Sequence, residues 1–166
     1  MRVISGRFKG VALTTPKSGT RPTTDRTKEA IFSHLDSWGV LDDARVLDLF
    51  AGTGALGIEA LSRGAKQAYL VEFGKEPLRC IKANLAKTHL EDQAVVLPVE
   101  VTYAVSKLEK QGTTFDIIYA DPPYRSGFEE KLAQLIGQSD IVKEDTLVIF
   151  ESALETPIDF IDEDVY

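Results

Sequence analysis

The sequence has a single cysteine, two histidines and no long hydrophobic run. One cysteine, Cys80, cannot form an intrachain disulfide or a multi-cysteine zinc site. His34 and His89 have no partners at metal-ligand spacing, so we expect no metal. No apolar stretch approaches the roughly 18 residues that a membrane-spanning helix requires, and the amino terminus lacks the apolar segment of a signal peptide. These absences predict a cytoplasmic protein that does not enter membranes.

Positive charge is scarce overall but concentrated at one end. The formal net charge is −7, which argues against a generic polyanion binder. Residues 140–166 contain nine acidic residues and only Lys143 as a base. Residues 1–30, in contrast, contain only two acids, Asp25 and Glu29, and these basic residues: Arg2, Arg7, Lys9, Lys17, Arg21, Arg26 and Lys28. A basic segment on an acidic body predicts contact with phosphate on one face of the molecule.

The chain of 166 residues is long enough for one domain, which we expect to span 1–166. Residues 1–38 read as a basic extension, with a short β-hairpin over 1–13 and a helix over 26–37. The apolar face of this helix is Ala30, Ile31 and Leu35, with Phe32 beside it. From residue 45 onward, strands alternate with helices. The strands are expected at 46–50, 67–72, 94–99, 115–120 and 146–151, and the helices at 54–63, 77–88, 103–111 and 127–137. This alternation predicts an α/β fold, a doubly wound and mostly parallel sheet over 45–166.

A glycine-rich turn follows the first of these strands. The segment Val46–Ala65 reads VLDLFAGTGALGIEALSRGA, an apolar strand, a turn of small residues and a helix that stops near Gly64. Ala51, Gly52, Thr53 and Gly54 form the turn and are expected to hold a nucleotide-like cofactor. The spacing GxGxxG also fits a dinucleotide site. Asp48 favours S-adenosylmethionine (SAM), because its carboxylate can accept hydrogen bonds from an ammonium and would repel a pyrophosphate.

Acidic residues at the ends of the next two strands extend this cofactor site. Glu72, with Phe73 beside it, ends the second strand, where a carboxylate can accept both hydroxyls of a ribose. A ribose occurs in NAD as well as in SAM, so Glu72 does not choose between them. Glu100 follows the third strand and is the candidate for the adenine amino group, with Val101 supplying backbone.

A second motif, Asp121-Pro122-Pro123-Tyr124, follows the strand at 115–120. The prolines fix the backbone and donate no hydrogen bonds, so the Asp121 carboxylate and the Pro122 carbonyl are left as acceptors. Two acceptors suit an exocyclic amino group with two N–H donors. The Tyr124 ring can stack on an extruded base, which contributes about 1–3 kcal/mol in other proteins. The motif predicts methyl transfer to an amino nitrogen, with positioning as the main catalytic contribution.

The glycine turn after Asp48 and the motif Asp121-Pro122-Pro123-Tyr124 together resemble the class I SAM-dependent methyltransferases. The opening MRVISGRFKG and the segment TRPTTDRTKEAIFSHL resemble, more narrowly, the bacterial 16S rRNA guanine-N2 methyltransferases of the RsmD family. The match continues through VLDLFAGTGALGIEALSRGA and IIYADPPY, so it covers most of residues 1–125.

The resemblance implies a seven-stranded sheet and 16S rRNA, in the small subunit or an assembly intermediate, as the substrate. It implies SAM contacts at Asp48, Gly52, Gly54 and Glu72 and a guanine amino group at Asp121 to Tyr124. Arg21, Pro22, Thr23 and Arg26 become a segment covering cofactor and base, although Arg21 and Arg26 could equally contact phosphate. The basic residues Arg2, Arg7 and Lys9 would add sequence-independent RNA affinity. We expect a monomer.

Two features depart from the family pattern. Glu100 stands where such enzymes commonly have Asp, and residues 156–166 are short for the antiparallel strand that should follow 146–151. We therefore expect a carboxyl end that is truncated or a sheet that is incomplete. Three other functions stay open: amino-methylation of adenine in DNA or of a protein glutamine, NAD-dependent oxidoreduction, and RNA binding without catalysis.

Overall fold

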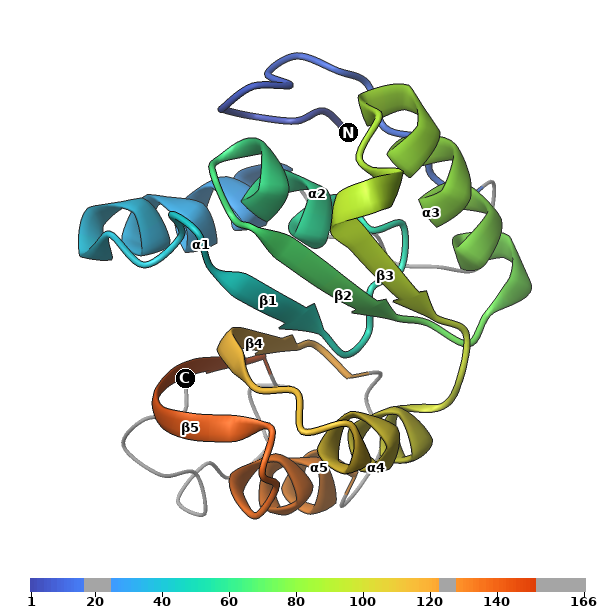
Figure 1. Ribbon diagram of the computed structural model, residues 1–166. Helices are drawn as coiled ribbons and strands as arrows, with labels where there is room; N and C mark the ends of the chain where they lie inside the picture. Colours follow the sequence, from blue (N-terminus) through green and yellow to red (C-terminus); the bar gives the residue numbers. More distant parts are fainter. Residues whose placement is uncertain (17–24, 123–127, 152–166) are drawn as a thin grey trace.

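The computed structural model of the protein describes residues 1–16, 25–122 and 128–151. Helices and strands alternate from the first strand onward, as the sequence predicts (Figure 1). The elements are α1 (Asp25–Trp38), β1 (Arg45–Asp48), α2 (Ala55–Ser62), β2 (Gln67–Val71), α3 (Lys75–Thr88), η1 (Glu91–Gln93), β3 (Ala94–Leu97), α4 (Val101–Lys110), β4 (Phe115–Ala120), α5 (Phe128–Gly137) and β5 (Val142–Phe150). None of the described helices is long and apolar enough to cross a membrane.

The sheet has five parallel strands in the order β3-β2-β1-β4-β5. β1 lies in the centre, where Asp48 is in register with Leu70 of β2 and with Tyr119 of β4. The chain moves outward in one direction from β1 to β3, then returns to the other side of β1 for β4 and β5. The strand order therefore reverses between β1 and β4. In open α/β sheets, ligands bind at such a reversal, outside the carboxyl ends of the strands.

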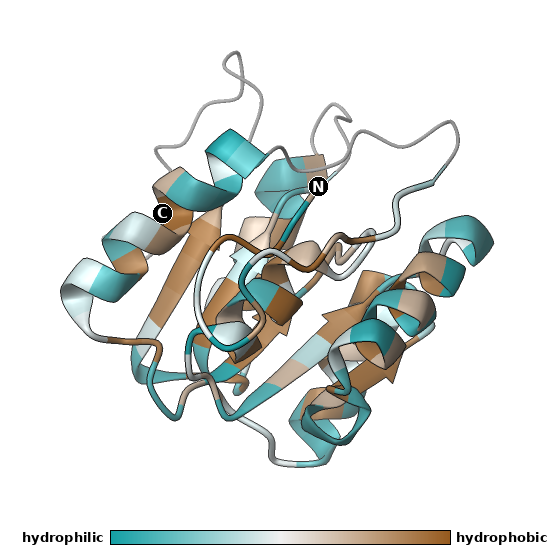
Figure 2. Cartoon of the chain, turned by 90° about the horizontal axis from the view of Figure 1, so that it is seen from above, coloured by the Kyte–Doolittle hydropathy of each residue, from teal (hydrophilic) through white to brown (hydrophobic). Residues whose placement is uncertain are grey.

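Helices cover both faces of the sheet, as a doubly wound fold requires. Figure 1 shows α1, α2 and α3 on one face and α4 and α5 on the other. Alternate residues of β1 serve the two faces, because successive side chains of a strand point in opposite directions. Val46 joins the core beneath α1 and α2, and Leu47 joins the core beneath α4 and α5. Figure 2 shows the apolar colour gathered on the strands between these helices.

The predicted amino-terminal hairpin exists as two paired segments with one antiparallel bridge, between Arg2 and Ala12. The Val3 amide donates to Val11 (2.9 Å), and the Leu13 amide donates to Met1 (2.8 Å). We name residues 1–16 the arm. In Figure 1 the arm lies over α2 and beside α3. It is part of the folded body, because Val3 and Leu13 are buried in the core of that face.

Two details of the predicted helices were wrong. On α1 the buried apolar residues are Phe32 and Leu35, whereas Ala30 is exposed, because the helix turns its face toward Arg63 and the sheet. Pro77 is the third residue of α3, which begins at Lys75. The described residues contain five of the seven strands that the resemblance implies, and the expected strand within 156–166 lies outside them.

Candidate active site

The glycine turn connects β1 to α2 at the strand-order reversal. Gly52 and Gly54 have φ angles of 57° and 81°, in the left-handed region that favours glycine. The third glycine of the pattern has a packing role: a Cβ on Gly57 would lie 2.4 Å from Cδ2 of Leu70. Nothing lies within 4 Å of the position that a Cβ on Gly52 would take. Gly52 is also the one turn residue from 51 to 54 that is not buried, so the turn presents its backbone to a ligand there.

Glu72, at the end of β2, binds the glycine turn directly. Its Oε1 accepts a hydrogen bond from the Gly52 amide (2.8 Å). Its Oε2 accepts from the amides of Phe73 (3.0 Å) and Gly74 (2.9 Å). The sequence predicts Glu72 as a ribose ligand. The structure adds a second role, because the same carboxylate fixes the turn to the end of the neighbouring strand.

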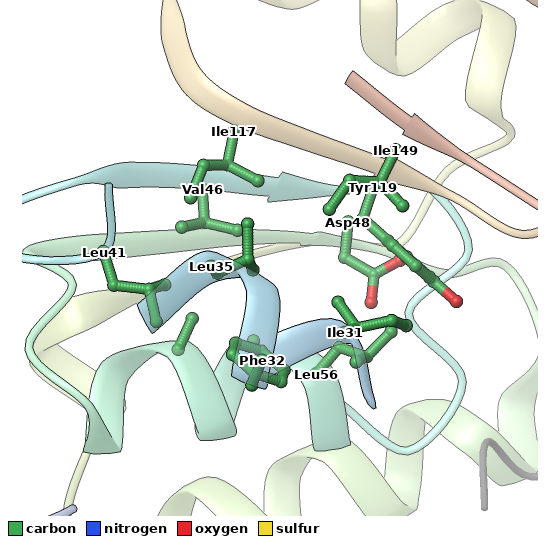
Figure 3. Close-up of a pocket in the computed structure, with 12 residues that line it drawn as sticks. Ile31, Phe32, Leu35, Leu41, Val46, Asp48, Leu56, Ile117, Tyr119 and Ile149 are labelled. Carbon is green, nitrogen blue, oxygen red and sulfur yellow. The ribbon is translucent and has the colours of Figure 1, made fainter. Parts of the chain in front are cut away.

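Asp48 is the last residue of β1 and is only 1% exposed. Its Oδ1 accepts from the Phe50 amide (3.1 Å). Burial raises the pKa of Asp48 to about 7, with the carboxylates of Asp121, Glu72 and Glu151 adding to the effect. The side chain borders a cavity of about 20 Å³ that is otherwise lined mainly by apolar side chains of α1, α2 and the strands (Figure 3). The Asp48 carboxylate is therefore at the carboxyl end of β1 but below the protein surface.

Carboxylates gather at the ends of four strands. Asp121 follows β4 and Glu151 follows β5, and the two strands stay paired to that point because the Glu151 amide donates to Ala120 (2.9 Å). Tyr119 lies between them and Asp48, and burial, together with these carboxylates, raises its pKa. The Tyr119 hydroxyl is buried without a hydrogen-bond partner in the described part of the chain. An acidic edge of this kind suits a cationic ligand.

Asn84 joins the turn to the arm from inside α3. Its Nδ2 donates to the Thr53 carbonyl (2.9 Å) and to the Thr14 carbonyl (3.0 Å), and its Oδ1 accepts from the Thr14 amide (2.6 Å). The side chain is fully buried, so these bonds are shielded from water. The arm is therefore held against the glycine turn at Thr14, two residues before the described part of the arm ends.

The predicted adenine contacts have different surroundings. Glu100 is the N-cap of α4, and its Oε1 accepts from the Thr102 amide (2.9 Å), which lowers the pKa of the carboxyl. Val101 is buried as the first residue of α4. Phe73 is 71% exposed beside the turn and is available to a flat ligand. The structure thus gives Glu100 a helix-capping role and leaves the adenine contact a prediction.

Arg7 of the arm lies at the opposite end of the strands from Asp121. The Arg7 guanidinium donates to Oε1 of Gln93 (3.2 Å), which immediately precedes β3. Arg2 donates to the Gly10 carbonyl (2.9 Å), and Lys9 is exposed. Arg26 is exposed on the first turn of α1. β3 has four residues and therefore spans about 13 Å from one end to the other. A substrate that contacts both ends of the strands must be extended.

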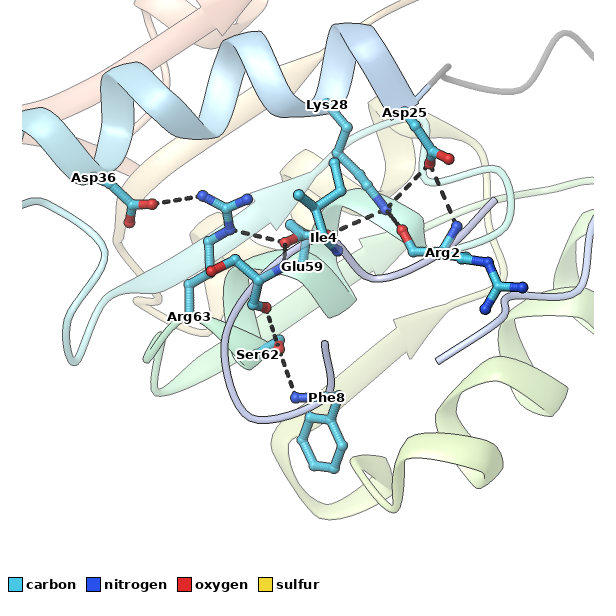
Figure 4. Close-up of polar contacts among 10 residues, drawn as sticks. Arg2, Ile4, Phe8, Asp25, Lys28, Asp36, Glu59, Ser62 and Arg63 are labelled. Carbon is cyan, nitrogen blue, oxygen red and sulfur yellow. Dashed lines mark hydrogen bonds and ion pairs between the residues drawn. The ribbon is translucent and has the colours of Figure 1, made fainter. Parts of the chain in front are cut away.

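A buried ion pair fixes the arm to α1 and α2 (Figure 4). Lys28 Nζ lies 3.2 Å from Glu59 Oε1 and donates to the Arg2 carbonyl (2.7 Å). Glu59 also accepts from the amides of Ile4 and Ser5 (2.9 and 3.0 Å) and from Arg63 Nε (2.8 Å). Both members of the pair are 0% exposed. The four donors satisfy the buried carboxylate and set the path of the arm.

Several predicted site residues lie outside the described residues: Arg21, Pro22, Thr23, Pro123 and Tyr124. The described residues bring together Asp48, Glu72 and Asp121, and no group of His, Cys, Asp and Glu among them could hold a metal ion.

Sequence reasoning missed three residues of this site. Asn84 had a detectable signal, a polar residue on the apolar face of its helix between Ile81 and Leu85. Glu151, at a strand end like Glu72, could have been found by the same logic. Tyr119 carried no signal, because it reads as an ordinary strand residue.

The arrangement is that of a class I SAM-dependent methyltransferase: a parallel sheet reversed at β1, a glycine turn, and acidic strand ends that suit the ammonium, sulfonium and ribose of SAM. The chain belongs to the family described as conserved hypothetical protein 95, whose model matches residues 1–163.

Relatives with assigned names span nearly the whole chain. The ribosomal RNA small subunit methyltransferase D of Escherichia coli (strain K12) is 38% identical over 156 residues, 93% of this chain and 76% of the relative. Its namesake in Haemophilus influenzae is 30% identical over 159 residues, 95% of this chain and 81% of the relative. The solved structure of a hypothetical protein from Thermus thermophilus, TTHA0928, is 34% identical, with a TM-score of 0.76 over 86% of this chain and 80% of that one.

Proposed function

We propose that this protein transfers a methyl group from SAM to the exocyclic N2 amine of a guanine in 16S rRNA. The observation that carries the proposal is the placement of two motifs at neighbouring strand ends. The glycine turn follows β1, and Asp121-Pro122 follows β4. The two strands are paired, and just after β1 the Leu49 amide donates a further hydrogen bond to the Tyr119 carbonyl of β4 (3.0 Å). A cofactor on the first and an amine on the second would be adjacent.

The acidic edge discriminates between the two cofactors that the glycine pattern allows. Asp48, Glu72 and Asp121 are close enough for their charges to interact, as the raised pKa of Asp48 reflects after the larger effect of burial. A pyrophosphate placed among them would be repelled, whereas an ammonium would be attracted. This charge distribution supports SAM over NAD.

When bound, SAM supplies a methyl group on a sulfonium, which is an electrophile. Asp121 and the Pro122 carbonyl would accept the two N–H groups of the guanine amine and orient its nitrogen toward the methyl group. As the new N–C bond forms, the bond from the methyl carbon to sulfur would break and S-adenosylhomocysteine would leave. The nitrogen would lose one proton, which the Asp121 carboxylate would accept. Pro122 is buried, and its ring fixes the backbone at this position. Tyr124 is expected to stack on the extruded base.

The rRNA substrate is supported by the relatives named ribosomal RNA small subunit methyltransferase and by the basic arm. Arg7 and Lys9 would contact phosphates at the end of the strands remote from Asp121. An extended substrate of this kind is a structured RNA or a ribonucleoprotein rather than a single nucleotide. The cytoplasmic location predicted from the sequence belongs to the same proposal.

The test is methyl transfer from labelled SAM to small subunits that lack the modification, and to naked 16S rRNA, followed by mapping of the methylated nucleotide. Label on a guanine N2 supports the proposal. Label found only on DNA adenine or on a protein glutamine would overturn the substrate. Reduction of NAD with no methyl transfer would overturn the reaction class.

The role of Asp121 is tested by Asp121→Asn. The variant should bind SAM within about threefold of the parent and lose at least about 100-fold in the rate of transfer, because it removes the proton acceptor and one orienting group. Asp140→Asn, an exposed acid outside the site, is the matched control for charge. Wild-type transfer by Asp121→Asn would refute the assignment.

A further inference from the structure

Helix α3 carries a positive face in a protein whose formal net charge is −7. Its sequence, KEPLRCIKANLAKT, contains four basic residues and one acid, Glu76. Lys75, Arg79 and Lys82 are all exposed. At 3.6 residues per turn their side chains fall within an arc of about 60°. Asn84 and Ile81 on the opposite side are buried, so this arc is the outward face of the helix.

The remaining charged residues of α3 are used within the fold. Glu76 pairs with Arg79, three residues away. Lys87 donates to Thr14 Oγ1 (2.8 Å) and to the Ala12 carbonyl (3.3 Å), so it holds the arm rather than facing outward freely. Lys75 and Lys82 make no ion pair with the described residues. A lysine of this kind carries an uncompensated charge, which is suited to a phosphate.

The positive face begins beside the glycine turn and extends along the first half of α3, in the direction of the arm. Lys75 begins α3 directly after Gly74, which donates to Glu72 in the cofactor site. The other end of α3 leads into η1, whose Gln93 holds Arg7 of the arm. The basic face from Lys75 to Lys82 occupies the first half of this 14-residue helix and is about 10 Å long.

We infer that the outward face of α3, formed by Lys75, Arg79 and Lys82, binds the phosphate backbone of the rRNA between the target guanine and the basic arm. The inference rests on the proposed function and extends it to a surface on the first half of α3. Charge complementarity selects the occupant: the face consists of three exposed basic side chains, of which Lys75 and Lys82 make no ion pair with the described residues, so it suits a phosphate chain rather than an apolar protein segment. Such contacts set affinity and register without reading sequence.

The test compares two triple variants that each remove three positive charges. Lys75→Gln/Arg79→Gln/Lys82→Gln alters the face of α3. Lys107→Gln/Lys110→Gln/Lys131→Gln alters exposed lysines of α4 and α5, on the other face of the sheet. The readouts are the affinity for 16S rRNA between 50 and 200 mM salt, chosen as about the range where phosphate contacts respond most, the affinity for SAM, and the unfolding midpoint.

The α3 triple variant should bind rRNA at least about tenfold more weakly, and its salt slope should fall by roughly 0.7–0.9 for each phosphate that the variant no longer neutralises. The control triple should keep the slope, and both should keep SAM affinity and the unfolding midpoint. If the two triple variants had the same salt dependence of rRNA affinity, the α3 surface would be overturned, even if the unsubstituted protein methylates rRNA. Absence of rRNA methylation by the unsubstituted protein would instead overturn the proposed function. Lys82→Glu alone repeats the test if the triple variant is unstable.

Discussion

The Glu72 carboxylate accepts a hydrogen bond from the backbone amide of Gly52 at 2.8 Å, across the gap between the ends of β2 and β1. The bond makes one side chain part of two elements of the site. It also explains why the turn keeps Gly52 in the left-handed conformation, with its open side toward the solvent edge. Glu100, the other predicted cofactor acid, has a different partner, because it accepts from the Thr102 amide of its own helix.

Glu72→Ala should weaken SAM binding by at least about tenfold, because it leaves the Gly52 amide unpaired and removes an acceptor for the ribose. Glu100→Ala should instead cost about 1 kcal/mol of stability through the lost cap of α4, with little effect on SAM affinity. Calorimetric titration with SAM and urea denaturation measure the two effects. Equal losses of affinity in both variants would assign Glu100 to the adenine and contradict this division of roles.

Asp48 should make stability depend on pH. Its pKa in the folded protein, about 7, exceeds the ordinary value of 3.8. The folded state therefore favours the protonated form, and the stability it contributes is fully present below about pH 4 and is lost as pH rises through 7. The free energy of unfolding should decrease by up to about 4 kcal/mol over this pH range. Asp48→Asn should flatten this fall, measured as urea midpoints at pH 5 and pH 8, whereas Asp140→Asn should retain it. An unchanged pH profile in Asp48→Asn would contradict the prediction.

SAM binding should couple to the same proton. A ligand ammonium near Asp48 favours the ionised carboxylate, so affinity should increase as pH rises from below 7 to above it. In Asp48→Asn the affinity should be lower and nearly independent of pH. Titrations in two buffers of different ionisation enthalpy would detect the released proton in the wild type and its absence in the variant.

Asn84→Ala should affect both stability and the site. The substitution leaves the Thr14 amide and the carbonyls of Thr14 and Thr53 without their buried partner, at a cost of about 1–3 kcal/mol. SAM affinity should fall as well, because the turn loses its anchor to α3. Thr88→Val is the matched control, a buried polar deletion on the same helix whose hydroxyl bonds only to helix carbonyls. A comparable loss of SAM affinity in Thr88→Val would reduce the Asn84 effect to general destabilisation.

Lys28→Met should destabilise the protein by about 3–5 kcal/mol, because it leaves the Glu59 carboxylate buried with one cation fewer. Asp36→Asn, which removes the exposed partner of Arg63 (2.5 Å), should cost less than about 1 kcal/mol. Urea denaturation measures both. Hydrogen exchange at Ile4 and Ser5 should increase in Lys28→Met, since their amides bond to Glu59. Protection of these amides at the wild-type level would show that the arm does not depend on the pair.

The order of strands and helices could be predicted because each element carries its own local pattern. Apolar runs marked the strands, and the predicted segments from 46–50 to 146–151 overlap the observed β1 to β5. The errors were at positions where a helix meets its neighbours. Ala30 looks as apolar as Phe32, and only the position of α2 decides which of the two is covered.

The site divides in the same way. Asp48, Gly52, Gly54, Glu72 and Asp121 could be assigned to one edge, because the carboxyl ends of parallel strands meet there. The partner of a side chain could not be assigned. Glu100 caps its own helix by accepting a hydrogen bond from the Thr102 amide, which its place after the third strand did not indicate, and its contact with adenine stays a prediction.

The sequence by itself determined the class of fold, the glycine turn and the family, because strand, glycine and motif spacing are local properties of the chain. Only the tertiary structure decided the contacts between residues that are distant in the sequence. Asn84 connects Thr14 to Thr53, and Lys28 is buried against Glu59. Burial of Asp48 raises the pKa of its carboxyl. Burial and hydrogen-bond geometry depend on which surfaces meet after folding. No pattern within one segment encodes them.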